Sequence, residues 1–141
     1  MTRKQVSKFF ARRDENWQRH DSAALAADHA EDGTVDSPLW GKVQGRTAIQ
    51  NTYSQFYVSF PDAEYHTEHL VIDGNRAVQF VKMAGTQKGD FCGLEPAGKR
   101  FQMNCAFLFF FSEGKIAHET RLYDFTGILV QVGVLKAKPA F

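Results

Sequence analysis

Residues 100–123 read RFQMNCAFLFFFSEGKIAHETRLY, and this stretch decides the fold. Arg100 to Phe111 is a long β segment, and Ser112-Glu113-Gly114-Lys115 is a turn signal before a second segment, Ile116 to Tyr123. Two such segments joined by a short turn with glycine predict an antiparallel hairpin. Residues 105–111 are apolar at every position. Because a strand with one face in water alternates, both faces of this strand are expected to be covered.

Two more β segments precede this hairpin. Residues 63–72 and 76–86 flank Asp73-Gly74-Asn75, a strong turn signal, so they are predicted to form a second hairpin. Residues 87–93 are expected to continue the later strand with a bend, because glycines within this stretch relieve the backbone.

The N-terminal part has the period of amphipathic helices. A first helix carries apolar residues at helical spacing, namely Val6, Phe9, Phe10 and Trp17. A short second helix is predicted after Asp21 or Ser22, either of which can cap it. A third helix follows Gly45 and has one apolar stripe, formed by Ile49, Tyr53, Phe56, Tyr57 and Phe60. A final short helix is predicted from Asp124 to Leu129.

Helices followed by a meander of long strands indicate an α+β fold rather than a parallel sheet. The 141 residues are expected to form a single domain, 1–141, with its own core. The 13 phenylalanines can fill that core, line a pocket or cover a subunit interface, and their number alone does not choose between these roles.

Charge and hydropathy argue against two classes of partner, nucleic acids and membranes. The net charge is +1, and the basic residues near the N-terminus fall between apolar positions of a predicted helix, so no nucleic-acid partner is expected. No stretch has the roughly 18 apolar residues of a membrane span, and no signal peptide is recognised. Cys92 and Cys105 lack metal-ligand spacing, so no metal is expected, and a cytoplasmic location with both thiols reduced is the default expectation.

Several short motifs of the C-terminal half resemble a known family. These are Gly85-Thr86-Gln87-Lys88-Gly89-Asp90-Phe91-Cys92-Gly93, then Gly98-Lys99-Arg100, then Gly114-Lys115-Ile116, then Asp124 with Leu129, Gln131 and Gly133. In this order they resemble the SnoaL-like polyketide cyclases of the nuclear transport factor two-like superfamily.

This resemblance implies a cone-shaped fold in which a curved antiparallel sheet, three N-terminal helices and a short C-terminal helix enclose a pocket. It also implies a homodimer packed through the sheet and a cofactor-independent ring closure by intramolecular aldol chemistry. The family's acid/base Asp at the end of the last strand matches Asp124 here.

Asp124 has two candidate roles. An aldol closure needs a proton removed beside a carbonyl and a proton delivered to an alkoxide, and a carboxyl group kept neutral by an apolar cavity can do both. Alternatively, Asp124 is the N-cap of the last helix, a position that Asp favours. Gly127 stands where Glu or Gln would complete a capping box. The residues leave both roles open.

The register of the last hairpin decides which residues can assist Asp124. A two-residue turn places Met103 opposite Asp124, whereas a three-residue loop places Gln102 there, with Asn104 next on that face. We favour the second register, because a buried carboxyl group needs hydrogen-bonding partners. Gln102 and Asn104 are then candidates to bind the substrate, or else are surface residues. Alternation puts Arg121 on the opposite face from Asp124.

A ketosteroid isomerase-like activity fits less well. The general base of those enzymes lies in an Asp-Pro pair after the first short strand, which is predicted here at 34–36, and the matching pair is Ser37-Pro38. Serine cannot replace that base. Asp36 would serve only if a bulge turned its side chain inward, and it is kept as a candidate binding residue.

Aromatic residues dominate the remaining candidates for the pocket wall. Trp17, Phe56 and Phe60 are the candidates for substrate binding, although aromatic stripes at helical spacing are more often core. No Arg or Lys cluster is assigned to the interior. A flat, largely apolar ligand with carbonyl or phenol oxygens is therefore expected.

The sequence favours an enzyme over a binding module without settling between them. The first hypothesis is a cofactor-independent cyclase- or isomerase-type enzyme on a hydrophobic, polyketide-like carbonyl compound, with Asp124 as acid/base. The second is a non-catalytic domain of the same fold that holds a small apolar ligand or only dimerises. A pocket with several convergent polar groups would favour the enzyme.

Overall fold

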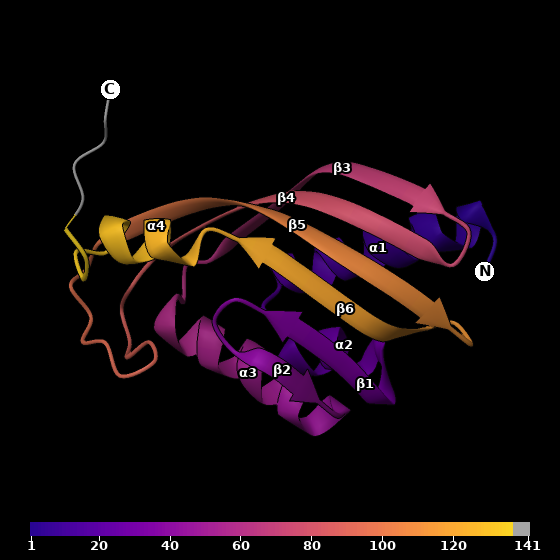
Figure 1. Cartoon of the computed structure of the whole chain (residues 1–141), viewed down its shortest axis with the longest axis horizontal. Coiled ribbons are helices and arrows are strands. Elements are labelled where there is room, and N and C mark those ends of the chain that lie inside the picture. The colour runs from indigo at the N-terminus through magenta and orange to yellow at the C-terminus, as the bar shows by residue number, and fades with distance from the viewer. Residues whose placement is uncertain (137–141) are drawn as a thin grey trace.

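The computed structural model describes residues 1–136 and contains four helices and six strands within them (Figure 1). The helices are α1 (Arg3–Gln18), α2 (Ser22–Ala27), α3 (Arg46–Ser59) and α4 (Phe125–Gln131). The strands are β1 (His29–Ser37), β2 (Gly41–Gln44), β3 (Glu64–Asp73), β4 (Arg76–Thr86), β5 (Arg100–Ser112) and β6 (Lys115–Tyr123). Residues 137–141, the end of the predicted domain, lie outside the described residues.

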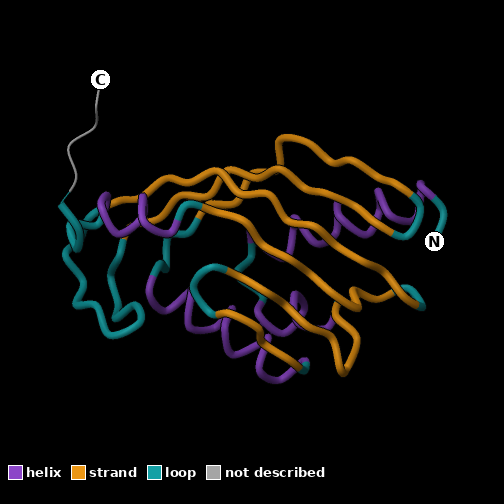
Figure 2. The backbone as a smooth tube through the Cα atoms, viewed as in Figure 1, coloured by secondary structure: helices purple, strands orange, loops and turns teal. Residues whose placement is uncertain are grey.

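The strands form one curved, open sheet in the order β2-β1-β6-β5-β4-β3 (Figure 2). The two hairpins predicted around Asp73-Gly74-Asn75 and Glu113-Gly114 are both present, with β4 also antiparallel to β5. The sheet is not wholly antiparallel, because β1 pairs with β6 in parallel. Parallel neighbours need a long connection, and here everything from β2 to β5 lies between them in the chain. The predicted α+β fold is confirmed.

Helices α1, α2 and α3 cover one side of the sheet (Figure 1). The aromatic stripe of α1 explains its position, since Phe10 packs edge-to-face on Phe109 of β5, with ring centroids 4.9 Å apart. Thr2 begins α1 with a capping box completed by Gln5, and Asp21 caps α2 as predicted. No described helix is long and apolar enough to cross a membrane.

Two segments differ from the sequence-based expectation. The strand β2 pairs with β1 but has only four residues, too few for a periodic pattern. Residues 87–99 form a loop rather than a continuation of β4. The buried Gln87 side chain donates to the Leu94 carbonyl at 2.9 Å, and Ser59 Oγ donates to the Asp90 carbonyl at 2.5 Å. These contacts fold the loop back over the end of α3.

Candidate functional site

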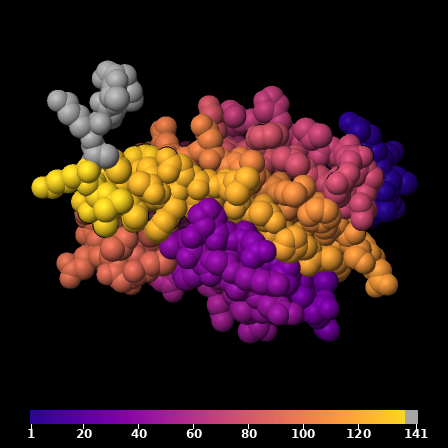
Figure 3. All heavy atoms as spheres, in the orientation of Figure 1, coloured from indigo at the N-terminus to yellow at the C-terminus, as the bar shows by residue number. Residues whose placement is uncertain are grey.

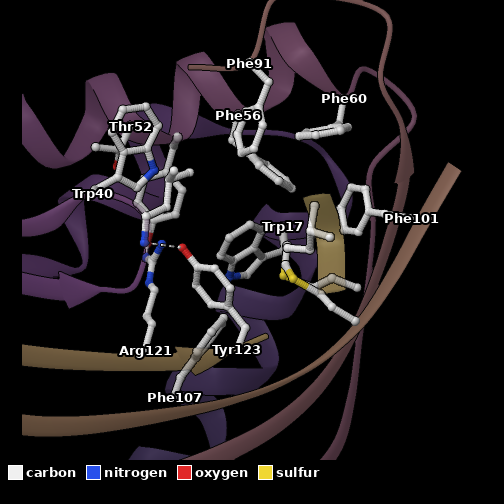
Figure 4. A pocket seen from close by; sticks show the side chains of 15 residues that line it. Trp17, Trp40, Thr52, Phe56, Phe60, Phe91, Phe101, Phe107, Arg121 and Tyr123 are labelled. Carbon is white, nitrogen blue, oxygen red and sulfur yellow. Dashed lines mark hydrogen bonds between the residues drawn. The ribbon is translucent and has the colours of Figure 1, made fainter. Parts of the chain in front are cut away.

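An aromatic cavity lies between the concave side of the sheet and helices α1 and α3 (Figure 4). The space between its atoms and the open solvent at its mouth together amount to about 580 Å³, of which the centre of a water molecule can occupy about 50 Å³. Its wall consists of Trp17, Leu39, Trp40, Thr52, Tyr53, Phe56, Phe60, Met83, Phe91, Phe101, Met103, Phe107, Arg121, Tyr123 and Ile128. Three predicted binding residues, Trp17, Phe56 and Phe60, are therefore brought together in one wall. None of the described lining residues is Asp, Glu or His.

Arg121 is the one charged residue of this wall within the described chain. Its Nε donates to Glu119 Oε1 at 2.9 Å and its Nη2 donates to Tyr53 Oη at 2.7 Å. Its Nη1 makes no hydrogen bond with any described residue, yet is not enclosed by protein, and the side chain remains 11% exposed. In Figure 4 the Arg121 side chain lies on the side of Trp40 and Thr52, while Phe60 and Phe101 lie on the other. The cavity thus has a polar end and an apolar end.

A buried ionic network holds Arg121 in place. Glu119 is fully buried and also lies 3.4 Å from His29 Nε2 and 3.9 Å from Arg13 Nη2. Arg13 Nη2 donates to Tyr53 Oη at 2.6 Å, so this phenol oxygen accepts from two guanidinium groups. Burial raises the pKa of Tyr53 more than the neighbouring Arg121 and Arg13 lower it, which keeps Tyr53 a neutral phenol.

The electrostatics of the network follow from burial and neighbouring charges. Burial alone would raise the pKa of Glu119, but its neighbours, first Arg121 and then His29 and Arg13, outweigh it and hold that pKa below its ordinary value. Burial lowers the pKa of His29 to about 3, so its imidazole is neutral at pH 7. A neutral His29 beside an ionised Glu119 leaves two buried guanidinium groups to neutralise that carboxylate.

The prediction that the interior holds no Arg or Lys cluster is wrong. Arg13 is buried completely, and Arg121 turns inward from β6. In the sequence Arg13 is not distinct from the exposed charges, because it sits among Arg12 and other basic residues of α1. Its position beside the apolar stripe was the one available signal, since a helix face that contains Phe9, Phe10 and Trp17 also includes Arg13.

A β-bulge in β6 explains why Arg121 faces the cavity. Ile116 pairs with Phe111, but His118 pairs with Phe110, so Ala117 is an extra residue between these two pairs. A bulge exchanges the faces of every later residue of the strand. Beyond it, Glu119 and Arg121 point toward the helices, whereas Leu122 is 63% exposed.

The same bulge leaves Asp124 outside the cavity wall. Asp124 is exposed and caps α4, where its Oδ1 accepts from the Gly127 amide at 2.9 Å. Gly127 leaves room for this carboxylate, since a Cβ there would lie 2.4 Å from Asp124 Oδ2. The requirement for acid/base chemistry, a carboxyl group in an apolar enclosure, is not met at this position, and the capping alternative describes the observed geometry.

Gln102 and Asn104 lie on the convex side of the sheet with Asp124, along an open polar groove. Cys105 pairs with Tyr123, so neither predicted register holds. In this register the next two positions opposite each other are Asn104 and Asp124. The backbone amide of Gln102 donates to Gln131 Oε1 at 2.7 Å, which ties α4 to β5. These two residues and Asp124 share a face, but that face is not the cavity.

Asp36 also lies outside the cavity wall. Its neighbour Val35 is buried, and Asp36 itself lies with Oδ2 3.6 Å from His118 Nε2. No bulge turns Asp36 inward, because β1 pairs regularly with β6 from Thr34 to Asp36. An isomerase base at this point of the chain is therefore not placed against the cavity.

The family model for SnoaL-like polyketide cyclases matches residues 8–132. The chain belongs to the SnoaL-like polyketide cyclase family. This confirms the resemblance noted in the sequence, and the match includes every lining residue of the cavity. No curated protein matches the chain in sequence.

Solved structures similar to this SnoaL-like chain share its fold. AclR from Streptomyces galilaeus, a proposed hydroxylase, has a TM-score of 0.85 at 18% identity, covering 99% of this chain and 91% of AclR. TsrD from Streptomyces laurentii has a TM-score of 0.84 at 20% identity, covering 96% and 99%. IdmH from Streptomyces antibioticus, a proposed polyketide cyclase, has a TM-score of 0.75 at 21% identity, covering 91% and 98%. At these identities the likeness concerns the fold alone.

Substitutions at Asp124 test its role as a helix cap. Asp124→Ala is expected to lower the free energy of unfolding by about 1 kcal/mol, whereas Asp124→Asn keeps a capping oxygen and is expected to change it little. Urea denaturation followed by circular dichroism measures both. An alanine variant as stable as the wild type would contradict the capping role.

Proposed function

We propose that the chain is a cofactor-independent cyclase- or isomerase-type enzyme that acts on a flat, largely apolar carbonyl compound, such as a polyketide-like molecule. The observation that carries this proposal is the aromatic cavity with one guanidinium group in its described wall. Aromatic walls fit a flat carbon skeleton, and the free Arg121 Nη1 can donate to its oxygen. Membership of the SnoaL-like polyketide cyclase family supports the substrate class.

Arg121 would act by stabilising an enolate. When a carbon beside a carbonyl loses its proton, negative charge develops on the carbonyl oxygen, and a preorganised donor in a water-poor site favours that charge. Glu119 and Tyr53 fix the guanidinium before the substrate arrives. Because the described wall contains no carboxylate or imidazole, the proton would leave to water. This favours substrates whose reacting carbon is already acidic, such as one flanked by two carbonyl groups.

Hydrogen–deuterium exchange of 2-tetralone, a flat bicyclic ketone, tests this function without knowledge of the natural substrate. The wild-type protein is expected to accelerate exchange at the carbon beside the carbonyl, as followed by proton NMR in D₂O. Arg121→Gln is expected to slow the accelerated exchange by about a hundredfold or more, the cost of losing one oxyanion donor. Arg100→Gln, at a half-exposed arginine outside the cavity wall, is the matched control and should exchange like the wild type.

A second candidate function is binding without turnover. The lack of a proton-transfer side chain in the described cavity wall favours it. In that case 2-tetralone would bind, as seen in ligand line broadening, but its exchange would proceed at the rate of the buffer. That result would overturn the enzymatic proposal and retain the binding site.

We also propose that the chain forms a homodimer through the convex face of its sheet. Phe80 is level with Ala106, and Ala106 with Leu122, so apolar residues of three strands lie side by side. Phe80 is 42% exposed and Leu122 is 63% exposed. None of the helices in the described residues covers β6 on the side seen in Figure 3. A second copy of the chain would cover this face and account for a strand that is apolar on both sides.

Light scattering at micromolar concentration tests the dimer. The wild type is expected to have twice the mass of one chain, and Leu122→Glu is expected to be a monomer, because each copy would bury a carboxylate in the interface. Val58→Glu is the matched control, since Val58 is 66% exposed on α3 and lies away from this face. A wild-type protein with the mass of one chain would contradict the proposal.

A further inference from the structure

The ionic network behind the cavity contains more guanidinium groups than carboxylates. Asp28 binds two of them, Arg12 Nη2 at 2.6 Å and Arg13 Nη1 at 3.0 Å. Glu119 binds Arg121 at 2.9 Å and lies 3.9 Å from Arg13. His29 does not alter this balance, because burial lowers its pKa to about 3 and leaves it neutral. Three guanidinium groups therefore share two carboxylates.

A fourth guanidinium group adjoins the network without a carboxylate partner among the described residues. Arg46 donates from Nε and Nη2 to the His29 carbonyl oxygen, at 3.1 and 2.7 Å. Its charge therefore adds to the positive side of the balance.

One nitrogen atom of the network offers a free N–H donor to the ligand space. The Arg12 side chain is 52% exposed, so water solvates it, and Arg13 is enclosed by protein on all sides. Only Arg121 lines the cavity, and only its Nη1 has no acceptor within the described chain. Among the lining residues, Trp17 has a buried polar atom without a hydrogen-bond partner in the described chain, and this Nε1–H is also a donor. The unpaired polar atoms in the wall are therefore donors.

From this free donor in an aromatic wall we infer that the cavity takes a monoanion, a flat apolar molecule whose carboxylate, enolate or phenolate oxygen pairs with Arg121 Nη1. This inference rests on the proposed function and narrows its substrate class from flat, largely apolar carbonyl compounds to those that carry one negative charge. A charge-assisted hydrogen bond is roughly twice as strong as a neutral one, and the aromatic walls keep the pair away from water. A phosphate dianion does not fit, because the described wall offers one free guanidinium nitrogen to its several oxygens.

A matched pair of probes tests the charge preference. Anthraquinone-2-carboxylate and anthraquinone-2-carboxamide have the same flat skeleton and differ in the charge of one substituent. Isothermal titration calorimetry of the wild-type protein at pH 7 is expected to give a dissociation constant about tenfold or more lower for the carboxylate. Equal affinities, or tighter binding of the amide, would overturn the inference while leaving the proposed ligand site standing.

Substitution of Arg121 locates the preference. Arg121→Gln is expected to bind the two probes with equal affinity, whereas Arg100→Gln, on the outside of the molecule, is expected to keep the wild-type ratio. A carboxylate preference that survives in Arg121→Gln would overturn the assignment to this residue. The wild-type comparison stands without the variant if Arg121→Gln fails to fold. Binding of neither probe to the wild type would overturn both the proposed function and this inference.

Discussion

Glu119→Gln is expected to lower the free energy of unfolding by about 3–5 kcal/mol, the usual cost of removing one partner of a buried ion pair. Glu119 is fully buried and is the carboxylate that Arg121 and Arg13 both approach. Glutamine has nearly the same shape, so the loss would come from charge rather than from a cavity. Arg121 would then have no carboxylate partner among the described residues, and Arg13 would keep only Asp28, which Arg12 also binds.

The matched control for this substitution is Glu68→Gln. Glu68 forms an ion pair with Lys82 at 3.2 Å on the convex side of the sheet, and its side chain is 37% exposed. Because exposed ion pairs contribute at most about 1 kcal/mol, this variant is expected to unfold almost like the wild type. Urea titrations of the three proteins at pH 7 give the comparison. If Glu119→Gln lost no more stability than Glu68→Gln, the buried network would not be an essential part of the fold.

The predictable part of the fold rests on local signals that the tertiary structure does not override. Asp73-Gly74-Asn75 and Glu113-Gly114 each combine residues that tolerate tight turns with long apolar segments on both sides, and both hairpins form as predicted. Residues 87–99 contain three glycines and one proline, which indicate a loop but do not determine its shape. Its shape depends on long-range contacts, such as the one between Ser59 and Asp90, which no local pattern indicates.

The site was harder to predict than the fold because one extra residue decides it. Without a bulge at Ala117, the alternation that places Ile116 inside would also place His118 and Asp124 inside. With the bulge, Glu119 and Arg121 occupy the positions that face the inside. Nothing in the sequence Lys115-Ile116-Ala117-His118 indicates a bulge, since it has neither glycine nor proline. Trp17, Phe56 and Phe60 of the wall were predictable because helical periodicity is not affected by strand register, whereas Phe91, Phe101, Phe107 and Tyr123, which come from strands and a loop, were not predicted.

The family match and the site geometry answer two separate questions, namely which fold the chain has and which residue at the end of β6 faces the cavity. Membership of the SnoaL-like family accounts for the fold, in which a cavity lies on the concave side of the sheet. The end of β6 presents a guanidinium group rather than a carboxyl group to that cavity. Proton transfer by Asp124 and charge stabilisation by Arg121 are therefore distinct mechanisms, and 2-tetralone exchange in variants of each residue tells them apart.

The stability of the protein is expected to fall in mild acid because of His29. Burial is the main cause that lowers the pKa of His29 from 6.5 to about 3, and Arg13, Arg121 and Arg46 add to it against the opposing effect of Glu119. Between these two pH values the unfolded chain carries a proton on His29 that the folded chain does not. Unfolding therefore takes up a proton, and the free energy of unfolding decreases as the pH falls below 6.5.

The size of this effect follows from one proton. Each pH unit in that window changes the free energy of unfolding by about 1.4 kcal/mol, so on the order of 3 kcal/mol is lost between pH 6.5 and pH 4 through His29 alone. The carboxylate of Glu119, whose folded pKa is lowered, loses its stabilising effect only when the pH falls further, through that lowered value. Urea titrations at half-unit pH intervals would follow both processes.

Comparison with His29→Gln isolates the histidine from the other groups that titrate in acid. The glutamine side chain does not titrate in either state, so the slope of stability against pH between 6.5 and 4 is expected to be shallower by about 1.4 kcal/mol per pH unit. His118→Gln is the matched control, since the His118 side chain is 35% exposed on the convex side of the sheet. Its slope should follow the wild type. A His29→Gln variant with the wild-type slope would mean that His29 is protonated in the folded protein, and the network would then hold a further positive charge beside Glu119.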